Sequence, residues 1–258
     1  MKPVRLLVIG DPHGSQKLLK LDTRGYDAAI ITGDFGRSDI MRGLAWGKKR
    51  ASKAAVSGSY KEYVETAVPV LRHISERLPV FCVQGNAEVS DDDIKVINKT
   101  LKTRIPLLEP ELARMRNLII LNHAVAKFKG IRIAGIGHFL EMRWVKEFSD
   151  IRLDKMLLAA IEEEIARIFF ANVGRVDVMV SHQPPYGILD KVNHRGAPKG
   201  WKGRHAGSML LLEYIRKYHP HYVICGHIHE GKGIKRVGKT TVINAGCCGD
   251  WRKLSVSR

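Results

Sequence analysis

Two histidines, His227 and His229, lie one residue apart near the C-terminal end of the chain. They follow an apolar run, residues 222–225, that is typical of a buried strand, and Gly226 after this run favours a loop. Because side chains two residues apart in an extended backbone point to the same side, both imidazoles can reach one place. Such a pair can be half of a metal site, although histidine pairs also occur on protein surfaces without a metal.

Side chains that can bind metal ions also follow four earlier apolar runs. They are Asp11 and His13, then Asp34, Asn86 and His182. Each of them alone could be a helix cap, a turn former or a core histidine with a satisfied hydrogen bond. In open α/β sheets, however, ligands bind outside the carboxyl ends of the strands. The recurrence at five strand ends therefore predicts one metal centre at this edge.

The order of these residues resembles that of the calcineurin-like metallophosphoesterase superfamily, over essentially the whole chain. The resemblance is carried by Asp11-x-His13, Gly33-Asp34, Gly85-Asn86, Ser181-His182 and Gly226-His227-x-His229. The segments His182-Gln183-Pro184-Pro185, Gly207-Ser208 and Asn244-Ala245-Gly246 are similar to a branch that includes small prokaryotic members. The resemblance implies an α/β fold of two facing mixed β-sheets flanked by helices, a four-layer α/β/β/α sandwich. We expect a single domain over residues 1–258.

The resemblance also implies two metal ions that share Asp34 as a bridging carboxylate. One ion would take Asp11, His13 and His229, and the other would take Asn86, His182 and His227. Two cations about 3.5–4 Å apart would clamp the oxygens of a phosphoryl group and lower the pKa of a bridging water, so that hydroxide can attack. Imidazole among the ligands favours divalent or trivalent transition metals over Mg²⁺ or Ca²⁺, with manganese first and iron, zinc, cobalt and nickel as alternatives.

One position departs from the superfamily pattern. Many members have a histidine directly after the asparagine, where it helps to protonate the leaving group, but this chain has Ala87 after Asn86. A general acid typically contributes about 10²–10⁴-fold to the rate, so we expect a replacement. We predict His205 as this catalytic residue, with His138 as a second candidate. Either could instead be an ordinary loop histidine.

The chain is strongly basic, with 43 Lys and Arg against 26 Asp and Glu and a formal net charge of +17. The positive charge gathers in residues 37–53, 191–204 and 252–253. Trp46, Tyr186 and Trp201 lie in or beside the first two segments, which could therefore hold a phosphate chain and stack a base. The charge indicates a polyanionic partner, such as a nucleotide or nucleic acid, although solubility would explain it equally well.

A repeated pattern of strand, polar loop and helix would position these residues. We predict strands over residues 4–9, 28–31, 80–83, 118–121, 131–134, 176–180, 222–225, 234–237 and 240–243. We expect a hairpin turn at residues 127–130, between the strands over 118–121 and 131–134. A capping box, Ser59 with Glu62, predicts the start of a helix that Pro69 should kink or break. Further helices are predicted from Ser90, over 153–170 and from Ser208.

Two further observations bear on the cellular compartment and on whether the chain crosses a membrane. The longest apolar runs are strand-sized, far below the roughly 18 residues of a membrane span, and the N-terminal run does not resemble a signal peptide. The four cysteines show no CxxC spacing, and Cys247 and Cys248 are adjacent, so a disulfide between them would be strained. We therefore expect a cytoplasmic protein with no membrane span.

Taken together, these features predict a metal-dependent phosphoesterase that hydrolyses a phosphodiester or phosphomonoester, most simply a nucleotide-like one. Two alternatives stay open. A nuclease acting on single-stranded DNA or RNA would also use the metal centre and the basic charge. A non-catalytic interaction module is the alternative outside enzymes, although a scaffold has no need to keep seven metal-type side chains.

Overall fold

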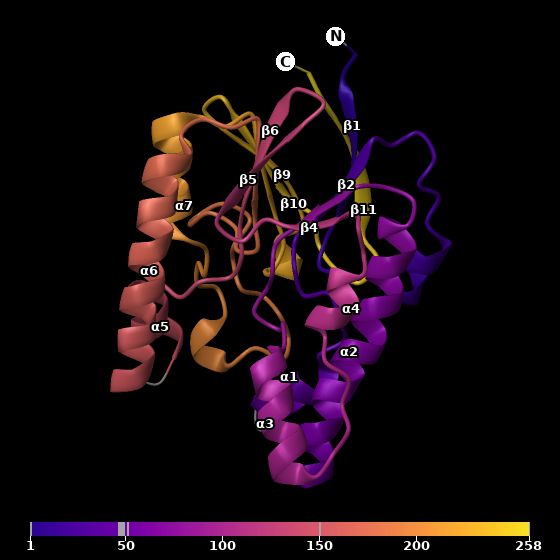
Figure 1. The fold of residues 1–258 in the computed structure, drawn as a ribbon. Coiled ribbons are helices and arrows are strands. Elements are labelled where there is room, and N and C mark those ends of the chain that lie inside the picture. Colours follow the sequence, from indigo (N-terminus) through magenta and orange to yellow (C-terminus); the bar gives the residue numbers. More distant parts are fainter. Residues whose placement is uncertain (1, 46–49, 51, 150, 258) are drawn as a thin grey trace.

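Two mixed β-sheets pack face to face, and helices cover the outer face of each sheet (Figure 1). The computed structural model describes residues 2–45, 50, 52–149 and 151–257. In the basic segment over residues 37–53, Trp46, Lys48 and Lys49 therefore lie outside the described residues. The predicted fold class, two facing mixed sheets flanked by helices, is confirmed. A single domain over residues 1–258 stays a prediction.

The first sheet has five strands in the order β11-β1-β2-β3-β4. Their bounds are β11 (Trp251–Val256), β1 (Val4–Ile9), β2 (Ala28–Ile31), β3 (Val80–Cys82) and β4 (Leu118–Ile120). Strands β1 to β4 are parallel to their neighbours, and β11 is antiparallel to β1. Four carboxyl ends therefore meet at one edge of this sheet.

The second sheet has six strands in the order β5-β6-β7-β8-β10-β9. Their bounds are β5 (Ala124–Phe128), β6 (Ile131–Ile136), β7 (Val178–Ser181), β8 (Tyr222–Cys225), β10 (Thr240–Asn244) and β9 (Gly233–Val237). The four central strands are parallel, and β5 and β9 are antiparallel edge strands. The carboxyl ends of β6, β7 and β8 carry three more of the loops in which candidate residues were predicted.

Alternation of side chains along β1 shows how the layers are built. Leu6 and Val8 lie in the cluster between the two sheets, together with Val178 and Val180 of β7. Leu7 and Ile9 point to the other side, into the cluster beneath the helices of the first sheet. A strand buried on both faces needs apolar residues at every position, which is why these strands are continuous apolar runs in the sequence.

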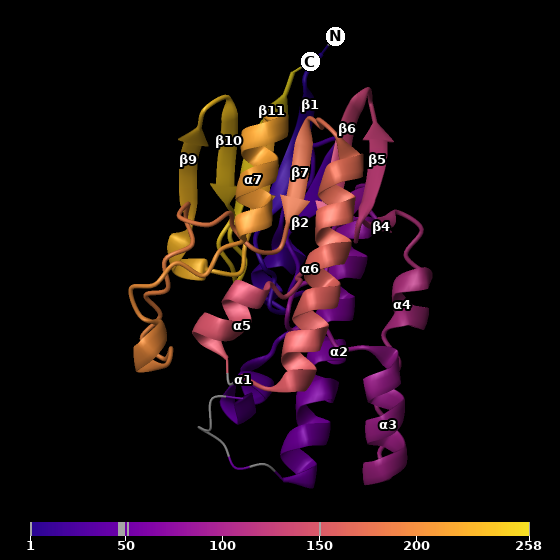
Figure 2. The same ribbon diagram turned by 90° about the vertical axis from the view of Figure 1, so that its left-hand side faces the viewer.

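Helices α2 (Lys53–Ser75), α3 (Asp91–Leu101) and α4 (Glu109–Ala113) pack on the first sheet. Helices α6 (Leu153–Val173) and α7 (Met209–Tyr218) pack on the second. Two short helices, α1 (Asp39–Ala45) and α5 (Met142–Phe148), lie beyond the carboxyl ends of the strands (Figure 2). Single 3₁₀ turns occur at η1 (Gln16–Lys20), η2 (Lys199–Trp201) and η3 (His229–Gly231). None of the helices in the described ranges is long and apolar enough to cross a membrane.

Helix α2 begins earlier than the sequence pattern predicts and is not interrupted. Ser52 caps it by accepting a hydrogen bond from the backbone N–H of Ala55 at 3.1 Å, so the predicted start at Ser59 is wrong. The Ser59 hydroxyl instead donates to the Val56 carbonyl inside the helix. Pro69 also lies inside the helix without ending it, because one face of α2 is buried against the first sheet on both sides of this residue.

The hairpin turn at residues 127–130 is confirmed, and so is a strand near residues 118–121, but this strand is not the one that the turn joins to β6. The turn joins β6 to β5, with Phe128 paired to Ile131. The predicted partner over residues 118–121 is β4, which belongs to the other sheet. Strand β5 alternates half-buried and exposed positions and lacks a long apolar run, so hydrophobicity alone did not reveal it.

Candidate metal centre

The seven predicted metal ligands come together where the carboxyl ends of the two sheets meet. Loops after β1, β2, β3, β7 and β8 carry them: Asp11 and His13, Asp34, Asn86, His182, and His227 with His229. Two overlapping groups of three side chains have ligand atoms close enough to hold an ion, Asp11 with His13 and His229, and Asp11 with Asp34 and His182. The described geometry therefore supports an Asp/His metal centre at the predicted edge.

The first donor group surrounds His229. Its Nε2 lies 3.2 Å from Oδ2 of Asp11 and 3.3 Å from Nε2 of His13. Nε2 of His13 lies 3.7 Å from Oδ2 of Asp34. Two imidazole nitrogens thus face each other beside two carboxylates. All four groups can donate a lone pair, and one cation could bind several of them at once, whereas one hydrogen bond joins only two.

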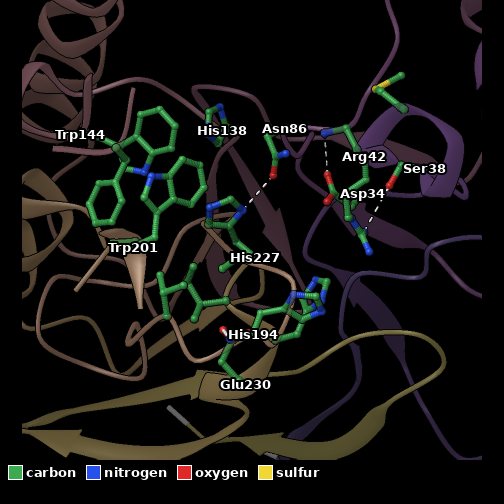
Figure 3. Close-up of a pocket in the computed structure, with 18 residues that line it drawn as sticks. Asp34, Ser38, Arg42, Asn86, His138, Trp144, His194, Trp201, His227 and Glu230 are labelled. Carbon is green, nitrogen blue, oxygen red and sulfur yellow. Dashed lines mark hydrogen bonds between the residues drawn. The ribbon is translucent and has the colours of Figure 1, made fainter. Parts of the chain in front are cut away.

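The second donor group surrounds Asn86. Its Oδ1 lies 3.0 Å from Nε2 of His182. The same oxygen lies 2.8 Å from Nδ1 of His227 (Figure 3). Nε2 of His182 lies 3.7 Å from Oδ1 of Asp34. The two oxygens of Asp34 therefore face different donor groups, which is the arrangement that a bridging carboxylate needs.

Metal binding requires ionised carboxylates and neutral imidazoles, and the pKa shifts of the two carboxylates and of two of the four histidines favour these states. Burial alone would raise the pKa of Asp11 and of Asp34, but the neighbouring His182 lowers both pKa values below the ordinary range. Burial lowers the pKa of His13 and of His227, so these two rings are neutral near pH 7. Burial alone would also lower the pKa of His182 and of His229, but the neighbouring carboxylates raise both pKa values. A cation at either ring would therefore bind in place of a proton.

Hydrogen bonds from neighbouring groups orient these ligands. Nδ1 of His182 bonds to the Thr32 carbonyl at 2.8 Å, so it carries the proton and leaves Nε2 free to bind a metal. The Thr32 hydroxyl donates to Oδ1 of Asp11 at 2.6 Å, and the backbone N–H of His227 donates to Oδ2 of Asp11 at 2.6 Å. Both oxygens of Asp11 are thereby fixed in direction.

The backbone at the ligands is strained, as is common at functional sites. His13, Asp34 and His227 have φ angles of 43°, 49° and 62°, in the left-handed region that residues other than glycine rarely adopt. Gly226 is required before His227, because a Cβ there would lie 2.0 Å from Oδ1 of Asp11. The Gly226-His227 pair therefore combines a close approach with a strained turn.

Glu88 joins two of the ligand loops, and the sequence analysis assigned it no role. Its carboxylate accepts hydrogen bonds from the backbone N–H of Phe35 at 3.0 Å, the hydroxyl of Tyr63 at 2.7 Å and the backbone N–H of Gly85. Burial and the nearby Asp34 raise the pKa of Glu88 to about 7. Its place two residues after Asn86 was the only signal in the sequence.

A cavity of about 360 Å³ opens onto the centre. Asp34, Arg42 and Ser38 lie on one side of it, Trp144 and Trp201 lie on the other, and Asn86, His138 and His227 lie between them (Figure 3). Trp201 was predicted from the sequence as a stacking residue, whereas Trp144 was not.

The two predicted general acids occupy different places. His138 lines the cavity, and its ring centroid lies 5.7 Å from that of His227 and 5.9 Å from that of His182. Burial and the charge of His182 lower the pKa of His138 to about 3, so its ring is neutral near pH 7. His205 is not among the described residues that line the cavity, and its Nδ1 lies 2.7 Å from Oδ1 of the buried Asp190.

Tyr186, another predicted stacking residue, lies beside His205 rather than in the cavity. The two ring centroids are 5.7 Å apart, and the guanidinium of Arg143 covers the Tyr186 ring at 4.5 Å. Asp190 holds this loop by accepting hydrogen bonds from the backbone N–H groups of Gly187 and Gly207, each at 2.9 Å. The described contacts of Tyr186 and His205 are thus those of a loop anchor.

Comparison with known sequences relates the chain to one family. A model of the calcineurin-like phosphoesterases matches residues 4–231. Metallophosphoesterase domain-containing protein 1 of Homo sapiens is 40% identical over 74 residues, which cover 28% of this chain and only 21% of that protein. Protein MJ1162 of Methanocaldococcus jannaschii is 23% identical over 178 residues, 67% of this chain and 66% of its own.

Solved structures agree on the fold. Phosphopantetheinyl hydrolase (PptH) from Mycobacterium tuberculosis superposes with a TM-score of 0.53 at 14% identity, over 93% of this chain and 88% of that one. The protein TT1561 of Thermus thermophilus superposes with a TM-score of 0.51 at 17% identity, over 99% of this chain and 100% of that one. The ordered motifs, the family match and the two-sheet fold lead to one conclusion: the chain belongs to the calcineurin-like phosphoesterase family.

Proposed function

We propose that the protein hydrolyses a small phosphomonoester or phosphodiester, a nucleotide-like one above all, at a dinuclear metal centre. The observation that carries the proposal is Asp34, whose Oδ1 faces the group around Asn86 and whose Oδ2 faces the group around His229. Asp11, His13 and His229 would hold one ion, and Asn86, His182 and His227 the other. Manganese is the metal we favour, with iron, zinc, cobalt and nickel as alternatives.

When bound, two such cations withdraw charge from the phosphoryl oxygens and make water a nucleophile near neutral pH. The side chains of this protein would orient the ester around them. Arg42 lines the cavity beside Asp34, so its guanidinium is placed to bind phosphate oxygens. Asn86 and His227 line the same cavity between Arg42 and the two tryptophans and would fix the position of the ester (Figure 3).

Protonation of the leaving group is proposed for a histidine. His205 stays a prediction, since its described bond is to Asp190. The cavity favours His138 for a different role, because its ring lines the space in which an ester would lie and is neutral near pH 7. Its N–H would stabilise the leaving oxygen by donating a hydrogen bond rather than by transferring a proton.

The test is turnover of bis-p-nitrophenyl phosphate and p-nitrophenyl phosphate by the Mn²⁺-loaded protein. We expect hydrolysis of at least one, abolished by a chelator and restored by Mn²⁺. A well-folded, metal-loaded protein that hydrolyses neither ester would contradict the proposal.

Two alternative functions can be tested separately. The net charge of +17 favours nucleic acid as a substrate. A salt-dependent affinity for nucleic acid, together with degradation of single strands, would favour a nuclease. An interaction module would bind no Mn²⁺ after soaking.

We also propose that the protein lies in the cytoplasm. Cys82 and Cys225 are buried and form no disulfide, which fits a reducing compartment.

A further inference from the structure

Three aromatic rings form a surface, the aromatic wall, on the side of the cavity opposite Asp34 and Arg42. Trp144 and Phe148 come from α5, and Trp201 comes from η2. Trp144 stacks on Phe148 with ring centroids 5.7 Å apart, and Trp201 meets both rings edge-on at 5.9 and 5.6 Å. The three rings therefore brace one another into a fixed surface.

The aromatic wall belongs to a hydrophobic cluster separate from the three that pack the sheets. Its buried members are Phe148, Val192, Ala197, Ala206 and Ile228, and Trp144 and Trp201 pack against it while half-buried. Large aromatic faces held at a cavity, outside the main cores, are costly to leave in contact with water. A ligand that covers them would recover this free energy.

Ile228 connects the aromatic wall directly to the metal centre. It lies between His227 and His229 in the chain, is 7% exposed, and packs in the same cluster as Phe148. The cluster behind the wall therefore includes a residue that is the chain neighbour of two predicted metal ligands. Because the three rings line the same cavity as Asp34, Asn86 and His227, one ligand in that cavity could contact both the wall and the centre.

The cavity thus has two chemically different sides, and both must be matched by one ligand. Arg42, Asn86 and the histidines suit an anionic phosphoryl group, whereas the opposite side is aromatic (Figure 3). The volume of about 360 Å³ is near the lower end for small-molecule sites. This space suits a phosphate, a linking sugar and one ring system.

On this basis, and resting on the proposed function, we propose that the aromatic wall is a stacking site for the nucleobase of a mononucleotide-type ester. Tryptophan faces attract flat π-systems more specifically than they attract aliphatic chains, and stacking tolerates any base. The site would thereby select aromatic phosphoesters over phosphorylated sugars and alkyl phosphates, whichever of the mono- or diesters is the substrate.

The test compares ligands that share one phosphate group. Adenosine 5′-monophosphate, ribose 5-phosphate and hexyl phosphate are measured as competitive inhibitors of whichever p-nitrophenyl ester is turned over. The first two differ only in the base, so their ratio of Ki values isolates stacking. We expect the nucleotide to bind about 5- to 150-fold more tightly than ribose 5-phosphate, the range found for aromatic–base stacking. Hexyl phosphate should bind no better than the sugar phosphate.

Variants locate the effect. Trp144→Ala and Trp201→Ala should each reduce the nucleotide-to-sugar ratio toward one, and Trp201→Phe should keep most of it. The matched control is Trp251→Ala, because Trp251 is 49% exposed on β11 and contacts Tyr26 rather than the cavity. Its ratio should equal that of the unmodified protein.

Each outcome decides between the two levels of the proposal. Equal Ki values for nucleotide and sugar phosphate, or a hexyl phosphate as tight as the nucleotide, would overturn the stacking site while hydrolysis stands. If neither p-nitrophenyl ester is hydrolysed, the proposed function fails, and calorimetric affinities of the same three ligands still decide the stacking site. The unmodified protein alone gives the ratio, so a variant that fails to fold leaves the test intact.

Discussion

Asp34 is the residue on which the two donor groups depend. It lies at a φ of 49°, is 4% exposed, and accepts a hydrogen bond from the backbone N–H of Ala87 at 2.8 Å through Oδ1. A carboxylate buried and turned in this way costs folding free energy, and the neighbouring histidines offset the cost by keeping it ionised. These features are consistent with the proposed role of Asp34 as a bridging carboxylate.

The two histidines of the β8 loop should serve different ions. Nδ1 of His227 approaches Asn86, and Nε2 of His229 approaches Asp11. We predict that His227→Ala and His229→Ala each lower the Mn²⁺ content from two ions per chain to about one. Each variant should lose a different ion, as electron paramagnetic resonance of the remaining Mn²⁺ would show. Identical spectra from the two variants would contradict this division.

The two candidate acids can be separated by matched substitutions. His138→Asn should lower kcat on an alkyl phosphoester by about 100-fold, because the imidazole N–H that could stabilise the leaving oxygen would be lost. His205→Asn should change kcat by less than about threefold, since its described partner is Asp190. A large loss from His205→Asn with none from His138→Asn would restore His205 as the acid.

The β8 loop is positioned by its neighbour β10. The side-chain Nδ2 of Asn244 donates to the carbonyls of Leu189, Gly226 and Ile228, at 3.1, 3.3 and 2.8 Å. Asn244 is fully buried, so no water replaces these bonds when they are lost. One strand end thus fixes the loop that carries two predicted metal ligands, His227 and His229, and Ile228 of the cluster behind the aromatic wall.

Removing this support should weaken both fold and centre. We predict that Asn244→Ala lowers the free energy of unfolding by about 2 kcal/mol, within the range for unpaired buried polar groups, as urea denaturation would measure. Mn²⁺ affinity should fall as well. Asn172→Ala is the control, because Asn172 is exposed on α6. Equal stabilities of the two variants would show that Asn244 is not the support.

Elements with a strong local pattern were predictable from the sequence, and those shaped by tertiary contacts were not. The buried parallel strands and their polar ends predicted the centre, since strand direction alone brings such ends together. Strand β11 was not predicted, because the sequence shows Arg252 and Lys253 only as a place where positive charge gathers, yet the strand pairs with β1 along its length. Helix α5 has two aromatic residues whose convergence with Trp201 depends on a loop far along the chain, which no local signal reveals.

At the scale of the whole molecule, the net charge of +17 should act on association with anions. We predict that kcat/KM for p-nitrophenyl phosphate falls by up to about tenfold as ionic strength rises from low to physiological values. Binding of uncharged adenosine, followed by tryptophan fluorescence, should stay constant over the same range. A salt-independent kcat/KM would mean that the basic charge serves solubility alone.

The two facing sheets form the centre only as a unit, because both contribute predicted ligands. The first sheet supplies Asp11, His13, Asp34 and Asn86, and the second supplies His182, His227 and His229. The most direct test is Mn²⁺ titration of the metal-free protein and of Asp34→Asn, followed by calorimetry. We predict two ions per chain for the unmodified protein and a loss of affinity at both positions in the variant. A single ion per chain, or two ions bound unchanged by Asp34→Asn, would contradict a dinuclear centre bridged by this residue.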